Sequence, residues 1–181
     1  MTSLVARIVE LHERLDVARL PHAFGGALAL AWCTQRARAT IDIDVNVFVD
    51  VDRLDDVLAA ISPPVACAAD DRRLLERDGQ ARLWWDETPI DLFLNTTAFH
   101  AAVAERVRRE PFGGVQVPFL ACSDLAVFKA FFDRTKDWAD LEEMHSAGTL
   151  DADRVIGVLA RYLGPDDTRI AKLLSLTAMP D

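Results

Sequence analysis

The sequence predicts an α/β (α+β) fold in which a small mixed β-sheet is flanked by helices and followed by a C-terminal helical part. Three observations lead to this prediction: helical periodicity at the start of the chain, strand-like alternation from 41 to 48, and nearly continuous helical spacing after Ser123. With 181 residues, 51% of them hydrophobic, the chain can bury a real core. We predict a core at 1–121 and a helical extension at 122–181 packed on it.

The first part of the chain changes its period twice. Apolar residues from Leu4 onward recur at helical spacing, and we expect this helix to end near Leu20-Pro21. Gly25-Gly26 then leads into an alanine- and leucine-rich segment at 27–32, which predicts a buried helix. From 41 to 48 apolar residues alternate with polar ones, so this segment predicts a strand with one core face and one functional face.

Turn signals divide the middle of the chain. Pro63-Pro64 ends a short helix at 54–61, Asp78-Gly79 predicts a turn, and Glu87-Thr88-Pro89 predicts a second turn before a strand at 90–94. The expected result is a meander that brings this strand beside the one at 41–48. The elements expected after it are a helix at 97–107, a strand at 115–120 and helices at 124–132, 136–145, 151–162 and 166–176.

Composition narrows the class of protein. A net charge of −9 disfavours a dedicated nucleic-acid binder and mildly favours a cationic small molecule or a protein partner. Cys33, Cys67 and Cys122 are odd in number and form no C-x-x-C, so we expect reduced, packing cysteines. The histidines lack metal-ligand spacing, and the apolar stretches are too short to cross a membrane. Because residues 1–4 also lack a basic start, we expect a cytoplasmic protein.

Three acids suggest a magnesium site. Asp42 and Asp44 stand one residue apart on a predicted strand, so both carboxylates leave the same face and repel each other unless a cation binds. Asp91 interrupts the apolar strand at 90–94, where an unpaired ionised carboxylate costs several kcal/mol. If the strands are neighbours, the three acids can hold two Mg²⁺ ions for nucleotidyl transfer, with Asp91 as general base.

A phosphate cradle and four further residues complete the candidate site. Gly25 and Gly26 let the backbone approach phosphate closely, and the following helix directs N–H groups at the anion. Arg38 and Thr40 flank the acidic strand and offer a charge and a hydroxyl. Lys129 and Lys136 are seven residues apart, which predicts one stripe of a continuous helix from which either could reach the nucleotide's phosphates.

Each feature has a simpler interpretation. A lone D-x-D is often solvated surface, and Gly-Gly before a helix is often only a turn. The charged residues between Lys129 and Asp140 could form an exposed ion-paired helix face, and Trp84 and Trp85 could pack at a sheet edge, although one could stack on a base. The conjunction, in order, of glycine pair, helix, arginine, acidic strand, hairpin and buried acid favours the functional interpretation.

These residues resemble a known superfamily. The runs H-A-F-G-G-A-L-A-L-A-W at 22–32 and R-A-T-I-D-I-D-V-N-V-F at 38–48 resemble the glycine and D-x-D signature of polymerase β-like nucleotidyltransferases. The Gly-Gly and R-x-T-x-D-I-D variant resembles the branch with AbiEii-type abortive-infection toxins and stand-alone minimal members. The run D-L-A-V-F-K-A-F-F-D-R-T-K-D-W-A-D-L at 124–141 is similar to that branch's later motif.

The resemblance spans about 22–141 and implies a nucleotidyltransferase-like core. It also implies Mg²⁺-dependent transfer of an NMP group from an NTP, such as ATP or GTP, to an acceptor hydroxyl, with release of pyrophosphate. It implies that Lys129 contacts the phosphates, beside a wall shaped by Arg134, Lys136, Asp137 and Asp140. The acceptor could be a cationic antibiotic, a tRNA end or a protein, and a cognate regulatory protein could control the enzyme. The C-terminal helices are shorter than the large second domain of full-length toxins. The alternative is a catalytically silent member that acts as an antitoxin-like binding or regulatory partner.

Overall fold

The computed structural model describes residues 3–178, which form two compact units. Within the described residues, the first unit contains 3–26 and 39–120, and the second contains 27–38 and 121–178. Residues 1 and 2, part of the segment on which the expectation of a cytoplasmic protein rested, lie outside the described residues. Within 3–178, no helix has both the length and the apolar character needed to cross a membrane.

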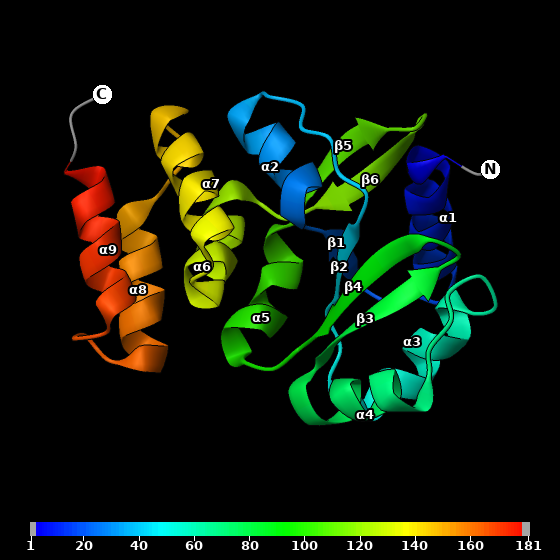
Figure 1. Ribbon diagram of the computed structural model, residues 1–181. Coiled ribbons are helices and arrows are strands. Elements are labelled where there is room, and N and C mark those ends of the chain that lie inside the picture. Colours follow the sequence, from blue (N-terminus) through cyan, green and yellow to red (C-terminus); the bar gives the residue numbers. More distant parts are fainter. Residues whose placement is uncertain (1–2, 179–181) are drawn as a thin grey trace. The chain divides into compact units, whose positions relative to one another are not determined.

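The first unit is built on a mixed sheet of six strands in the described part of the chain, in the order β3-β4-β2-β1-β6-β5 (Figure 1). In this sheet β2 pairs in parallel with β4 and antiparallel with β1, while β1 pairs in parallel with β6. The predicted mixed sheet and fold class are therefore confirmed. The strands are β1 (His22–Phe24), β2 (Ile43–Val47), β3 (Gln80–Trp85), β4 (Thr88–Leu94), β5 (Arg108–Phe112) and β6 (Val115–Phe119).

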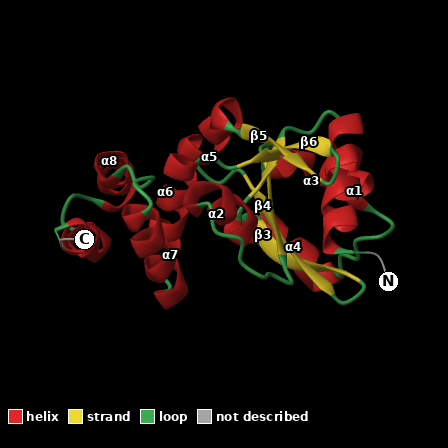
Figure 2. Cartoon of the chain, turned by 90° about the horizontal axis from the view of Figure 1, so that it is seen from above, coloured by secondary structure: helices red, strands yellow, loops and turns green. Residues whose placement is uncertain are grey.

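Short helices surround this sheet. Ser3 caps α1, because its Oγ accepts a hydrogen bond from the Ala6 N–H at 3.2 Å. The buried side of α1 includes Ile8, Leu11 and Leu15, and α1 packs near α3 on one side of the sheet (Figure 2). The helical elements of this unit are α1 (Leu4–Val17), η1 (Val51–Arg53), α3 (Leu54–Ile61), α4 (Ala69–Asp78), α5 (Ala98–Val103) and η2 (Ala104–Arg106).

The strand pair β2 and β4 forms the centre of the core and explains why acids can stand there. Alternate residues of both strands are almost completely buried, and each such side chain contributes roughly 1.5–3 kcal/mol. Of the intervening positions, Asp44 and Asp91 are only partly buried. The core face is formed by Ile43, Val45, Val47, Ile90, Leu92 and Leu94.

Two details of the predicted meander were wrong. Residues before Gly79 form helix α4, and Gly79 ends it in the left-handed conformation at φ 67°, so Asp78-Gly79 is a helix terminus and not a hairpin turn. The hairpin is β3–β4, and Asp86 and Glu87 form its turn. Strands β1 and β5 were not predicted, and residues 97–107 divide into α5 and η2 before β5 begins.

The second unit is helical. Its helices are α2 (Gly26–Thr34), which begins at the last residue of the first unit, α6 (Cys122–Phe132), α7 (Thr135–Ser146), α8 (Ala152–Leu163) and α9 (Thr168–Thr177). The predicted continuous helix through Lys129 and Lys136 is wrong. Asp133 adopts a left-handed conformation at φ 54° and ends α6, so the two lysines lie on different helices.

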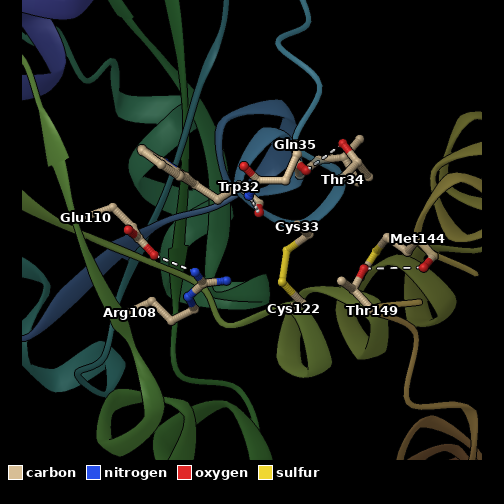
Figure 3. The surroundings of a disulfide bond; sticks show 10 residues. Trp32, Cys33, Thr34, Gln35, Arg108, Glu110, Cys122, Met144 and Thr149 are labelled. Atoms are coloured by element: carbon tan, nitrogen blue, oxygen red, sulfur yellow. Dashed lines mark hydrogen bonds and ion pairs between the residues drawn. A yellow bond between two sulfur atoms is a disulfide. The ribbon is translucent and has the colours of Figure 1, made fainter. Parts of the chain in front are cut away.

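The prediction of reduced cysteines was also wrong for two of the three. Cys33 near the end of α2 and Cys122 at the start of α6 form a disulfide with a Cα–Cα distance of 5.6 Å (Figure 3). Cys67 is a free thiol. The sequence separation of 89 residues hides this pairing, because only the packing of the second unit brings the two positions together.

Candidate functional site

The sheet places the three predicted acids at neighbouring backbone positions. Asp44 of β2 is directly opposite Asp91 of β4 in the parallel register, so both side chains leave the same face. Asp42 stands just before β2 and, two residues from Asp44, points to that face as well. The predicted neighbourhood of the two acidic strands is thus present.

Thr40 orients the first acid. Its hydroxyl donates to the Oδ1 of Asp42 and lies 3.3 Å from the Asp42 carbonyl oxygen. Sequence analysis placed Thr40 at the nucleotide. The structure shows its hydroxyl bonded to an aspartate at the start of the acidic strand, and its contact with a nucleotide stays a prediction.

Arg82 of β3 is a fourth member of the site that sequence analysis missed. Its Nε and Nη2 donate to the two oxygens of Asp91, each at 2.7 Å, in a bidentate pair. The same Nη2 lies 3.9 Å from the Oδ2 of Asp42. These hydrogen bonds with Asp91 raise the pKa of Arg82 above its ordinary value, with smaller contributions from the charges of Asp91, Asp42 and Asp44.

This guanidinium changes how the buried acid is stabilised. We expected a metal ion to offset the cost of ionised Asp91, whose side chain is 21% exposed, but Arg82 supplies the opposite charge. Within residues 3–178, no group of three or more histidine, cysteine, aspartate or glutamate side chains is arranged to hold a metal ion. The three carboxylates share one face, Asp91 is paired with Arg82, and metal binding by the three acids stays a prediction.

The donor set nevertheless suits a divalent cation. Carboxylate oxygens are the ligands that Mg²⁺ prefers, and here a side-chain cation already stands among two of them. A divalent ion at this position would bring two positive charges to the three carboxylates, where the guanidinium brings one. Asp42, Asp44 and Asp91 therefore remain the residues that could hold Mg²⁺.

The glycine pair lies against the second acid. The Gly25 N–H donates to the Asp44 carbonyl at 2.9 Å, which fixes the turn to β2. Gly26 has φ 53°, and a β-carbon on it would lie 1.9 Å from the Oδ2 of Asp44. Only glycine fits at this position, both for its conformation and for its space. Because Gly26 also begins α2, the glycine turn, an aspartate and a helix N-terminus meet at one point.

A buried polar pair supports this turn from beneath and was also missed. Asn46 lies close to Gly25, with its Nδ2 3.2 Å from where a Gly25 β-carbon would be. The Oδ1 of Asn46 accepts a hydrogen bond from the Nε2–H of His100 at 3.1 Å. Burial lowers the pKa of His100 to about 4, so the imidazole stays neutral and keeps this bond at neutral pH.

In the second unit, the predicted cations are part of an ionic cluster. The Lys129 ammonium is buried, 2.5 Å from Asp140 and 3.7 Å from Asp137. Asp140 also accepts from Arg38 at 2.6 Å, while Arg134 pairs with Asp137 at 2.5 Å. Thus the Lys129 charge is held by carboxylates, and Arg38 and Arg134 are the partly exposed cations of the cluster.

Lys136 has no place in this cluster. It is exposed in the first turn of α7. The structure thus brings Asp42, Asp44, Asp91, Gly25, Gly26 and Thr40 together in the first unit, while Arg38 and Lys129 meet in the second.

Arg82 could have been found from the hairpin. With a two-residue turn at Asp86 and Glu87, the register pairs Arg82 with Asp91 across the strands. Our placement of the turn at 87–89 shifted this register and hid the pair. Asn46 and His100 gave no such signal, because the contact is between residues 54 apart.

Comparisons with known proteins identify the fold. No protein-family model and no curated protein gives a significant match. The solution structure of the antibiotic-resistance factor ANT(2'')-Ia is similar with a TM-score of 0.61 at 15% identity, covering 94% of this chain and 95% of that chain. The crystal structure of ANT(2'')-Ia in complex with adenylyl-2''-tobramycin gives 0.58 at 16%, covering 98% and 100%.

A third solved structure has the same type of fold. An antigenic nucleotidyltransferase-like protein from Paracoccidioides brasiliensis gives a TM-score of 0.50 at 13% identity, covering 94% of this chain and 92% of that chain. The chain therefore has a nucleotidyltransferase-like fold. The finer resemblance to AbiEii-type proteins stays a prediction.

Proposed function

We propose that this protein is a Mg²⁺-dependent nucleotidyltransferase that moves an NMP group from an NTP to an acceptor hydroxyl. The observation that carries the proposal is the meeting of Asp44 with Gly26 on one side and with Asp91 on the other, within a fold shared with nucleotidyltransferases. A phosphate-binding turn that touches a carboxylate is the arrangement that a metal-bound triphosphate requires.

Each residue has a defined task in the proposed reaction. Asp42 and Asp44 would hold two Mg²⁺ ions and Asp91 would bind one of them; such ions lower the pKa of an acceptor hydroxyl and neutralise triphosphate charge. Gly25 and Gly26 would bind phosphate oxygens through backbone N–H groups. Asp91 would accept the hydroxyl proton as the acceptor oxygen bonds to the α-phosphorus and the bond to pyrophosphate breaks.

The predicted cations have a narrower part in the proposal. Both Arg38 and Lys129 are paired with Asp140, but Arg38 is about half exposed and would be available to an anion, whereas the Lys129 ammonium is buried. Contact of Lys129, Lys136 and Arg38 with the nucleotide's phosphates stays a prediction. Thr40 would act through Asp42, whose carboxylate it holds.

Among acceptors, we propose a cationic polyhydroxylated small molecule. ANT(2'')-Ia has been solved with adenylyl-2''-tobramycin, and a net charge of −9 on this chain favours a positively charged acceptor. A tRNA end or a protein hydroxyl would be the alternative.

ATP or GTP labelled in its NMP group, incubated with Mg²⁺ and with aminoglycosides, tRNA or protein in turn, tests the proposal. We expect transfer of label to one acceptor class and a loss of about 10²–10⁴-fold for Asp91→Asn. Asp56→Asn, which removes an exposed carboxylate on α3, is the matched control and should keep full activity. Nucleotide binding without transfer to any acceptor would favour the catalytically silent, regulatory alternative.

A further inference from the structure

Arg82 is a charged side chain of the candidate site to which the proposed reaction assigns no task. We propose that Arg82 is a tethered counterion of the aspartate site: it keeps the Asp91 carboxylate oriented before a divalent cation binds, and it competes with that cation for the carboxylate. Arg82 would thereby set the divalent-cation concentration that the site requires. This inference rests on the proposed function.

The hydrogen-bond geometry makes the competition direct. Arg82 Nε bonds the Oδ1 of Asp91 and Nη2 bonds the Oδ2, both at 2.7 Å, so both oxygens are engaged. A Mg²⁺ ion would need one of these oxygens at about 2.0–2.1 Å. Each oxygen keeps a second lone pair, but an ion bound to either oxygen would lie beside the guanidinium charge, so the repulsion between the two cations makes them compete for Asp91.

The reach of Arg82 distinguishes it from an ordinary cross-strand pair. Arg82 and Asp91 are directly opposite each other on β3 and β4. In a simple cross-strand pair, Arg82 would contact Asp91 and no other acid of the site. The Nη2 also lies 3.9 Å from Asp42, which precedes β2 on the far side of β4. The guanidinium is therefore placed toward two of the three carboxylates of the proposed metal site.

Release of Arg82 is structurally simple. β3 is an edge strand of the sheet, and the Arg82 side chain is half exposed, so the guanidinium can leave Asp91 for water. Asp91 is the less exposed partner, so its carboxylate, more than the guanidinium, needs a counterion. A tethered cation on the edge strand and a soluble cation would thus alternate on the same carboxylate.

Binding of Mn²⁺ alone to the full chain tests the inference without relying on catalysis. Titration calorimetry, or the electron paramagnetic resonance signal of free Mn²⁺, would measure the Mn²⁺ affinity of wild type, Arg82→Gln and Arg82→Lys. The control is Arg53→Gln, which removes the cation of the exposed Arg53–Asp56 pair. We expect Arg82→Gln to bind Mn²⁺ about three- to tenfold tighter, since one competing charge is gone. Arg82→Lys should lie between the two, because an ammonium leaves one oxygen free, and Arg53→Gln should match wild type.

The outcomes separate the two proposals. Equal or weaker Mn²⁺ binding by Arg82→Gln, with wild-type binding intact, would overturn the role of Arg82 and leave the proposed function standing. If folded wild type and every variant fail to bind Mn²⁺, the metal chemistry of the proposed function falls as well. Circular dichroism checks that each variant is folded. If Arg82→Gln does not fold, Arg82→Lys becomes the deciding variant. Mn²⁺ binding by Arg82→Lys that is no tighter than that of wild type would then contradict the competition.

Discussion

At the scale of single residues, the contact between Gly26 and Asp44 links backbone conformation to the proposed chemistry. The positive φ of Gly26 and the missing β-carbon allow the turn to lie against the aspartate. Any L side chain at this position would meet the Asp44 carboxylate and adopt a disfavoured conformation. A side chain at position 26 would therefore displace the Asp44 carboxylate, which we assign to metal binding.

Gly26→Ala should therefore lower the free energy of unfolding by about 2 kcal/mol or more and weaken nucleotide binding. Urea unfolding measures the first effect and calorimetry the second. Gly157→Ala is the matched control, because Gly157 lies within helix α8 with open space around its α-carbon. That variant should gain about 0.5–1 kcal/mol. Equal behaviour of the two variants would contradict the proposed packing at Gly26.

Two buried histidines make stability depend on pH. Burial lowers the pKa values of His22 and His100 to about 4 from 6.5, and the Nδ1–H of His22 donates to the Leu20 carbonyl at 2.8 Å. Between these pKa values the unfolded chain binds more protons than the folded chain. Stability due to the neutral imidazoles is complete above about pH 6.5 and is lost as the pH falls toward 4.

Urea unfolding at pH 7, 6 and 5 should accordingly show falling stability. His100→Gln should flatten this dependence, because it removes one of the buried groups that take up a proton on unfolding. His145→Gln, on the last turn of α7, is the control substitution of a histidine at a position that is not buried. A slope that persists in full in His100→Gln would show that this histidine is not buried in its neutral form.

At the scale of elements, the disulfide ties helix α2 to helix α6 within the second unit (Figure 3). It closes a loop of 89 residues, and cross-links of such span restrict the unfolded chain strongly. The double variant Cys33→Ser, Cys122→Ser should lose about 2–4 kcal/mol of unfolding free energy. Cys67→Ser, which removes the free thiol, is the control and should unfold like wild type.

Alkylation of the unfolded, unreduced protein followed by mass spectrometry counts the thiols. One alkylated cysteine, Cys67, is the expected result, rising to three after treatment with a dithiol reductant. Three alkylated cysteines without reductant would contradict the disulfide.

Elements with a clear period were predicted from the sequence, and those without one were not. The alternation in β2 and β4 and the spacing of the C-terminal helices give the correct element types, because burial of one face dictates both patterns. β1 has three residues, too few to show a period. β5 carries Arg108, Arg109 and Pro111, which suit an edge strand but hide its pattern.

The candidate site was predictable where it depends on neighbouring residues and not where it depends on tertiary contact. Asp42 and Asp44 share a face by alternation, and their relation to Asp91 follows once β2 and β4 pair. The partners of Asp91 and Lys129 are Arg82 and Asp140, and both pairs depend on register or helix packing. Sequence pattern marks a charged residue in an apolar segment, but the counterion comes from the fold.

At the scale of the whole molecule, the acidic balance favours some acceptors over others. With a formal charge of −9, the field of the protein attracts cations and repels polyanions outside a local basic region. This balance is consistent with a cationic acceptor and with divalent ions at the aspartates. Activity on a cationic acceptor should therefore fall as ionic strength rises.

The central claim is that Asp42, Asp44 and Asp91 hold Mg²⁺ for an NTP bound at Gly25 and Gly26. Calorimetric titration of the full chain with a non-hydrolysable ATP or GTP analogue, with and without Mg²⁺, tests it most directly. We predict binding that requires Mg²⁺ and weakens at least about tenfold in Asp44→Asn but not in Asp56→Asn. Nucleotide binding of equal strength without Mg²⁺ or in Asp44→Asn, or no binding of either analogue, would contradict the claim.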